Sequence, residues 1–114
     1  IEKLFDREFE KRNKPAFQTI LYSWLYAREH KDVEINPGLY ITRKLFQTDF
    51  APMVVMDKEV FNLNENIQEF ENYLQQVLSE LMDVTVPFDQ TILQKNCEYC
   101  PYVDICHRRT SKKF

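Results

Sequence analysis

The most regular pattern of apolar positions lies between residues 64 and 83. Polar side chains alternate there with apolar ones that recur every three or four residues, at Ile67, Phe70, Leu74, Val77, Leu78 and Leu81. This spacing places the apolar groups on one face of a helix. We predict an amphipathic scaffold helix over residues 64–83, and Pro87 ends the pattern.

A second apolar stripe begins after Asn13-Lys14-Pro15, which is typical of a helix start because a proline in the first turn costs no hydrogen bond. Its members share one helical face and should be buried: Phe17, Ile20, Leu21, Trp24 and Leu25. Residues 1–12 also place apolar groups along one side of a short helix: Ile1, Leu4, Phe5 and Phe9. Residues 1–31 are therefore predicted to be helical.

The pattern changes after the breaker Asn36-Pro37-Gly38. Residues 39–46 are rich in β-branched and aromatic side chains, alternate partially, and predict a strand. Residues 53–56 predict a second short strand, which Pro52 restricts to an edge or to its first residue. Residues 39–56 thus form a strand region, and the fold class is α+β, mostly helical with one or two short strands.

Composition and charge narrow the function classes. The 114 residues correspond to one domain, and 44% hydrophobic content is sufficient for a modest core. Residues 57–83 carry seven acids and one lysine, which would repel phosphates and disfavours DNA binding by the 64–83 helix. Four bases follow position 107 and indicate either nucleic-acid contact or a solvated tail: Arg108, Arg109, Lys112 and Lys113.

The chain offers no apolar run of membrane-spanning length and no signal peptide, so we expect a cytoplasmic protein without membrane contact. It also begins at Ile1, without an initiator methionine and inside a helix-like run. We therefore expect residues 1–114 to be a single domain fragment of a larger protein.

Gln18 and Tyr22 lie four residues apart on the border of the apolar stripe in the second helix. That spacing places them on one face, so an amide and a phenol could both reach into an adjacent cleft. They could instead form the polar edge of a packed helix, and the spacing alone favours this second interpretation.

All three cysteines fall within ten residues, as Cys97, Cys100 and Cys106. The Cys-x2-Cys pair offers two thiolates from one turn, and a helical turn starting at Pro101 would bring the third sulfur alongside. Zinc and iron–sulfur sites usually take four ligands, and neither His107 nor His30 is well placed to be the fourth. Clustered cysteines favour metal binding over three unbonded thiols, of which two could oxidise to each other.

Taken together, these features resemble the C-terminal end of a RecB/AddB-type PD-(D/E)XK nuclease domain over nearly the whole chain. The match includes the Gln-x3-Tyr helix, the Gly38-Leu39-Tyr40 strand, the amphipathic helix, the Pro87-Phe88 link and Cys-x2-Cys-x5-Cys. The resemblance implies an incomplete restriction-endonuclease-like α/β fold. It also implies that Gln18 and Tyr22 border the active site and help to position DNA.

For the cysteines, the resemblance implies that Cys97, Cys100 and Cys106 are three ligands of a four-iron, four-sulfur cluster whose first cysteine lies upstream. It further implies a parent helicase–nuclease with a partner subunit, acting in DNA double-strand break repair and recombination. The parent active site would hold Mg or Mn on an Asp and a Glu/Asp-x-Lys.

The sequence of this chain shows no such catalytic set of an Asp and a Glu/Asp-x-Lys on neighbouring strands. The one Glu-x-Lys is Glu29-His30-Lys31, which falls at a helix end and is interpreted as surface charge. We expect the catalytic strands to precede Ile1 and this fragment alone to be inactive, with its cluster incomplete or lost. We also expect it to expose apolar surface or to form a homodimer. The alternative is a small zinc- or iron–sulfur-binding interaction module without nuclease ancestry.

Overall fold

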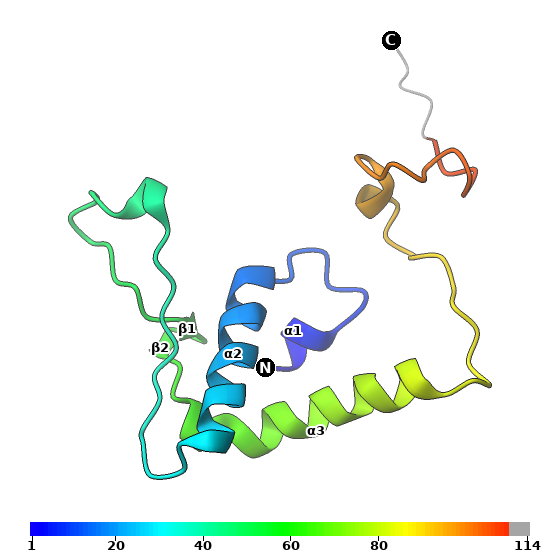
Figure 1. Cartoon of the computed structure of the whole chain (residues 1–114). Coiled ribbons are helices and arrows are strands. Elements are labelled where there is room, and N and C mark those ends of the chain that lie inside the picture. Colours follow the sequence, from blue (N-terminus) through cyan, green and yellow to red (C-terminus); the bar gives the residue numbers. More distant parts are fainter. Residues whose placement is uncertain (110–114) are drawn as a thin grey trace.

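The computed structural model describes residues 1–109 and is built mainly from two helices (Figure 1). Its elements are the helices α1 (Glu2–Phe5), α2 (Lys14–Glu29) and α3 (Leu63–Met82), the 3-10 helices η1 (Thr42–Lys44) and η2 (Gln94–Cys97), and the strands β1 (Val55–Met56) and β2 (Glu59–Val60). The helix expected within residues 1–12 is thus shorter than predicted. The predicted starts of the two long helices agree with the structure to within one residue.

Asparagine caps determine where the two long helices begin. The Asn13 side-chain oxygen accepts a hydrogen bond from the backbone N–H of Ala16 at 3.1 Å, and Pro15 follows in the first turn of α2. The Asn62 side chain accepts from the N–H groups of Asn64 and Glu65 at the start of α3. Each cap satisfies donors that have no partner inside the helix.

The core forms where α1, α2 and α3 meet around Phe70, which is fully buried. Its ring centroid lies 5.5 Å from that of Phe5, 6.1 Å from that of Phe17 and 6.5 Å from that of Trp24. Of the predicted buried stripe of α2, Ile20 is buried, Phe17, Leu21 and Trp24 are partly buried against the core, and Leu25 is 48% exposed. The buried hydrophobic residues are Leu4, Ala16, Ile20, Val54, Phe61, Leu63 and Phe70.

Apolar surface remains exposed along the second half of α3. The predicted apolar face packs well at Phe70 and partly at Ile67 and Leu74. The same face is exposed further along the helix, at Val77, Leu78, Leu81 and Met82. The periodicity predicted the face correctly, but the described residues provide no partner that covers its second half.

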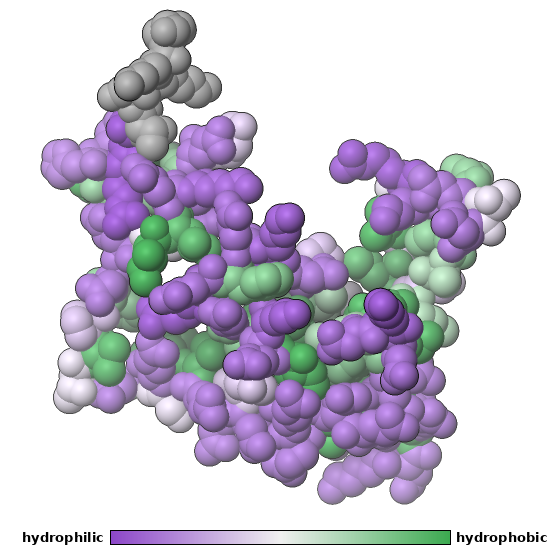
Figure 2. Space-filling view, turned by 180° about the vertical axis from the view of Figure 1, so that it is seen from behind, coloured by the Kyte–Doolittle hydropathy of each residue, from purple (hydrophilic) through white to green (hydrophobic). Residues whose placement is uncertain are grey.

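The C-terminal segment (residues 83–109) leaves the body of the molecule and contains no buried residue. The radius of gyration, 17.8 Å, exceeds the roughly 13 Å expected for a compact domain of about 100 residues. Figure 2 shows a notch between this segment and the loop of residues 39–53, with apolar surface inside it. The described part of the chain is therefore open rather than closed over one core.

The predicted strand over residues 39–46 is wrong. Only Gly38 forms an isolated antiparallel bridge, to Met53, and the Leu39 N–H donates to the Pro52 carbonyl at 2.6 Å. Beyond it the chain turns through η1, and Phe46 is 96% exposed. A strand continues only where a neighbour accepts its hydrogen bonds, and beyond Leu39 this segment has no paired strand among the described residues.

The observed sheet is a two-residue antiparallel hairpin instead. Val55 pairs with Val60 and Met56 with Glu59, so the second predicted strand is confirmed at its C-terminal end. Asp57 and Lys58 both have positive φ, 51° and 74°, as a tight two-residue hairpin turn requires. The chain is mostly helical with a small sheet, which confirms the predicted α+β class.

Candidate functional site

Gln18 and Tyr22 project from the side of α2 that faces away from the core. The Gln18 Nε2 donates to the Tyr22 Oη at 3.4 Å, and the Tyr22 side chain is 62% exposed. The opposite side of the same turns carries the buried Ile20. The two predicted site residues are therefore brought together, and they lie on open surface rather than inside a cleft.

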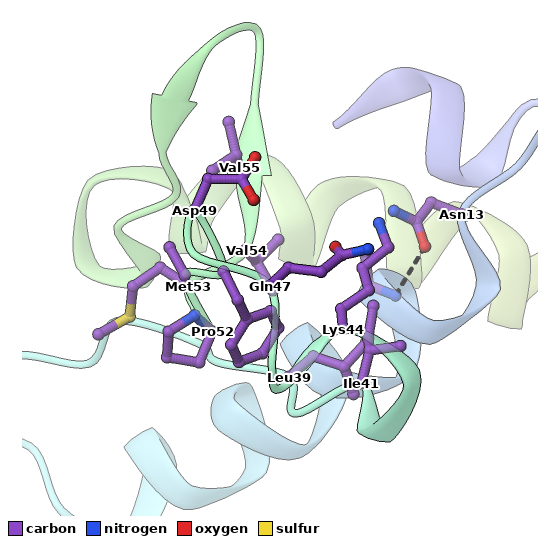
Figure 3. A pocket seen from close by; sticks show the side chains of 13 residues that line it. Asn13, Leu39, Ile41, Lys44, Gln47, Asp49, Pro52, Met53, Val54 and Val55 are labelled. Atoms are coloured by element: carbon purple, nitrogen blue, oxygen red, sulfur yellow. Dashed lines mark hydrogen bonds between the residues drawn. The ribbon is translucent and has the colours of Figure 1, made fainter.

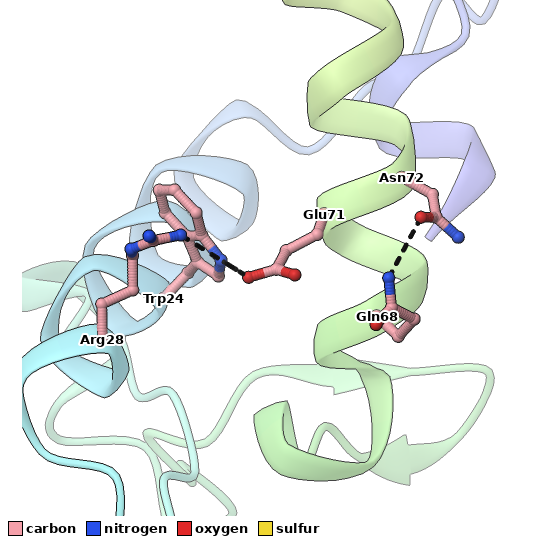
Figure 4. Close-up of polar contacts among 5 residues, drawn as sticks. All are labelled: Trp24, Arg28, Gln68, Glu71 and Asn72. Carbon is pink, nitrogen blue, oxygen red and sulfur yellow. Dashed lines mark hydrogen bonds and ion pairs between the residues drawn. The ribbon is translucent and has the colours of Figure 1, made fainter.

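A polar contact between α2 and α3 fixes which side of α2 faces outward (Figure 4). The Trp24 indole N–H donates to the Glu71 carboxylate at 2.7 Å, and the Arg28 guanidinium lies over the indole ring at 5.2 Å from its centroid. Arg28 also approaches Glu71 at 4.0 Å. This contact holds the two helices in a defined rotation, so Gln18 and Tyr22 are positioned by the core behind them.

A hollow of about 250 Å³ opens beside the start of α2 (Figure 3). Its wall combines the capping residue Asn13 with the loop of residues 39–55, which contributes polar groups at Lys44, Gln47 and Asp49. A strand over residues 39–46, as predicted from the sequence, would leave no such hollow. No motif in the loop marks it, so only the folded arrangement shows it.

The three cysteines lie on the C-terminal segment, far along the chain from α2. All three are free, half-buried thiols, and Cys97 ends η2. The helix predicted from Pro101 is wrong, because residues 101–107 form a series of turns. Within residues 1–109, no three His, Cys, Asp or Glu side chains are close enough together to hold a metal ion.

The chemistry of three thiols suits zinc or an iron–sulfur cluster, but within residues 1–109 the three sulfurs are not gathered into a metal site. Metal ligation by Cys97, Cys100 and Cys106 therefore stays a prediction. The loop that carries them is closed by Arg108, which donates to the Gln90 side chain at 2.8 Å and to the Thr91 carbonyl.

Two bases of the predicted basic tail are engaged within the chain. Arg108 closes the cysteine loop as described above, and Arg109 pairs with Asp104. Lys112 and Lys113 lie outside the described residues. The described part of the tail thus gives less support to nucleic-acid contact than the sequence alone did.

Comparison with protein families decides the ancestry of the chain. The sequence model of the PD-(D/E)XK nuclease superfamily matches residues 4–107, which include both the Gln18–Tyr22 pair and the three cysteines. The chain belongs to the PD-(D/E)XK nuclease superfamily. No curated protein and no solved structure matches it.

The catalytic carboxylates and lysine that characterise a PD-(D/E)XK nuclease are not assembled within residues 1–109. The strands of the hairpin contain one acidic residue, Glu59, and no lysine. Glu29-His30-Lys31 lies where α2 ends, and the His30 ring stacks on that of Tyr26 at 4.0 Å between centroids. No helix in the described part of this PD-(D/E)XK chain is long and apolar enough to cross a membrane.

Proposed function

We propose that this chain is the C-terminal segment of a cytoplasmic RecB/AddB-like helicase–nuclease that acts in DNA double-strand break repair and recombination. Superfamily membership over residues 4–107 supports nuclease ancestry. Within the chain, Gln18 and Tyr22 position DNA next to catalytic groups that lie outside it. A helicase–nuclease partner subunit and active-site Mg or Mn belong to the parent protein.

The observation that carries this proposal is the hydrogen-bonded Gln18–Tyr22 pair on the exposed side of a helix whose other side is buried. A pair that served only as a packed edge would lie against neighbouring side chains. Here the Gln18 amide and the Tyr22 phenol point to solvent, and the packing of the other side of α2 fixes their position without a bound ligand. Both groups can donate to phosphate oxygens and accept from base edges.

The proposal is tested by DNA binding and cleavage with the same protein. The chain should bind single-stranded DNA, and Gln18→Ala and Tyr22→Phe should each weaken binding about fivefold, because one hydrogen bond contributes about 1 kcal/mol. Gln76→Ala, on the exposed side of α3, and Tyr40→Phe, on the 39–53 loop, are matched controls. Equal losses in the controls would contradict the role of the pair.

Cleavage is the second half of that test. Incubation with single- and double-stranded DNA and magnesium or manganese should leave the DNA intact, because an amide and a phenol do not hold a catalytic divalent ion. Cleavage that follows the protein peak through purification would contradict the proposal. It would point to Glu29 and Lys31 as catalytic groups, which Glu29→Ala would test.

A second candidate function is a small metal-binding interaction module, favoured by the closed loop that carries three free thiols. Under the main proposal, Cys97, Cys100 and Cys106 contribute three ligands to a four-iron, four-sulfur cluster, and the isolated chain does not retain stoichiometric iron. Elemental analysis after anaerobic preparation separates the two functions. Stoichiometric zinc would favour the module, and stoichiometric iron with cluster absorption would contradict the expected loss.

A further inference from the structure

Five exposed residues spaced four apart form one continuous row along α2 and its C-terminal cap. The α2 row consists of Lys14, Gln18, Tyr22, Tyr26 and His30, all of them exposed. Residues four apart are neighbours on a helix surface. Each step of the row advances about 6 Å along the helix axis and turns about 40° around it.

The second half of the row contains a pair of side chains in contact, as the first half does, but here both side chains are aromatic rings. The Tyr26 and His30 rings are almost parallel, at 8°, with their centroids 4.0 Å apart, and Tyr26 is 51% exposed. The His30 Nδ1 lies 3.1 Å from the Tyr26 carbonyl oxygen. Because a carbonyl only accepts, the Nδ1 that contacts it carries a proton, and this contact fixes the orientation of the ring.

The charge of this surface differs from that of the other long helix. Helix α2 carries two bases, Lys14 and Arg28, and one acid, Glu29, and the α2 row itself contains one lysine and no carboxylate. Helix α3 carries four acids and no base. A single nucleic-acid strand is attracted by basic groups along its backbone, and its unpaired bases stack on aromatic faces. The α2 row offers one basic group, Lys14, at one end and the exposed stacked pair Tyr26–His30 at the other.

We infer that the α2 row is a contact track for single-stranded DNA, in which the Tyr26–His30 pair stacks on an unpaired base beyond the Gln18–Tyr22 pair. Lys14 attracts a phosphate at the other end of the track. This inference rests on the proposed DNA-positioning function and adds the kind of DNA and three further contact residues. Tyr22 and His30 are separated by about 12 Å of helix rise, which gives room for more than one nucleotide.

The test uses the whole chain and a fluorescein-labelled oligothymidine, with anisotropy measured at fixed salt. Tyr26→Leu should weaken binding at least about fivefold, because stacking on one base contributes at least that much. Tyr26→Phe keeps the ring and should bind like the unchanged chain. The matched control is Tyr40→Leu, an exposed tyrosine on the 39–53 loop, which should also bind normally.

A spectroscopic signature separates stacking from a structural effect. An oligonucleotide containing 2-aminopurine should lose fluorescence when it binds the unchanged chain or Tyr26→Phe, and should keep it with Tyr26→Leu. If Tyr26→Leu loses helical circular dichroism, His30→Gln replaces it, because glutamine removes the ring and is tolerated at a helix end. An oligonucleotide bound to His30→Gln should also keep its 2-aminopurine fluorescence.

The outcomes distinguish this inference from the function on which it rests. Normal binding and quenching by Tyr26→Leu, together with weakened binding by Gln18→Ala, would overturn the track and leave the proposed function intact. Normal binding by Gln18→Ala and Tyr22→Phe would overturn the proposed function. A chain that binds no single-stranded DNA would overturn both, and stronger binding to duplex than to single strands would overturn the track.

Discussion

The body of the molecule (residues 1–82) and the C-terminal segment (residues 83–109) keep their shape in different ways. All of the buried hydrophobic residues belong to the body, between Leu4 and Phe70. The C-terminal segment has none, and it is held by local turns and by exposed contacts such as the Lys95–Glu10 ion pair at 3.0 Å. Exposed ion pairs of this kind contribute little to stability.

This difference separates the two candidate sites. Gln18 and Tyr22 are placed by a helix that is packed through its other face, so their geometry exists before any ligand binds. Cys97, Cys100 and Cys106 lie where no apolar burial fixes the backbone. A metal or a partner surface would have to gather them, at a cost in chain entropy. Within residues 1–109, the Gln18–Tyr22 pair is therefore preorganised, whereas the three cysteines are not.

The largest expected contrast lies in core truncation. Phe70→Ala should cost about 3–5 kcal/mol of unfolding free energy, because the ring is fully buried among Phe5, Phe17 and Trp24. Phe88→Ala, in the C-terminal segment, should cost less than about 0.5 kcal/mol, because the ring is 89% exposed. Chemical denaturation followed by circular dichroism measures both.

Similar losses from these two phenylalanine substitutions would mean that the C-terminal segment packs on the body in solution and belongs to the same cooperative unit.

Self-association is expected from the apolar surface that the body leaves exposed. The second half of α3 exposes Leu78, Leu81 and Met82, and a two-fold dimer could cover this face in both copies. Leu81→Gln should then weaken the dimer at least about tenfold, because each protomer loses roughly 1 kcal/mol of apolar burial. Light scattering across a concentration series measures the change.

Gln76→Ala, on the polar side of the same helix, is the control for this variant. A strictly monomeric chain that also fails to bind an apolar dye would show that the face is covered internally.

A smaller effect is expected at the start of α3. Asn62→Ala should cost about 1 kcal/mol of unfolding free energy, because the side-chain oxygen accepts from the N–H groups of Asn64 and Glu65. Asn72→Ala, within the same helix, removes only an exposed contact with Gln68 and should change stability by less than about 0.5 kcal/mol. Equal effects in thermal denaturation would argue against the cap.

The smallest expected effect lies at the junction of the two regions. Hydrogen bonds from the Thr85 hydroxyl and backbone N–H lower the pKa of Asp83 below its usual range. Because the folded pKa is depressed, the ionised Asp83 contributes to the stability of the folded chain at pH values above its unfolded pKa. That contribution to stability is lost as the pH falls through the folded pKa. Thr85→Val should raise the pKa of Asp83, which a carboxyl NMR titration measures. An unchanged titration would mean that the turn is not formed.

Sequence reasoning predicted the two long helices well because their signals are local. Proline in the first turn and three-to-four spacing located the starts of α2 and α3 to within one residue. The same reasoning predicted Gln18 and Tyr22 as neighbours. It could not tell an exposed pair from a packed edge, because exposure depends on the rotation set by Trp24 and Glu71.

The errors occur where structure depends on distant partners. Residues 39–46 have strand-like composition, yet beyond Gly38 no neighbouring strand is available among the described residues, and the segment turns instead. The hairpin turn at Asp57-Lys58 has no glycine, so its usual signal is missing. Leu25 continues an apolar spacing but lies beyond the surface that α3 covers.

The most direct test of the central claim, that the exposed side of α2 is the DNA-contacting surface, is a chemical-shift map. The nitrogen-15-labelled chain would be titrated with a short single-stranded oligonucleotide. We predict that the largest shifts fall on Gln18, Tyr22, Tyr26 and His30, and that α3 changes little. Shifts confined to α3 or to residues 83–109, or no shifts at all, would contradict the claim.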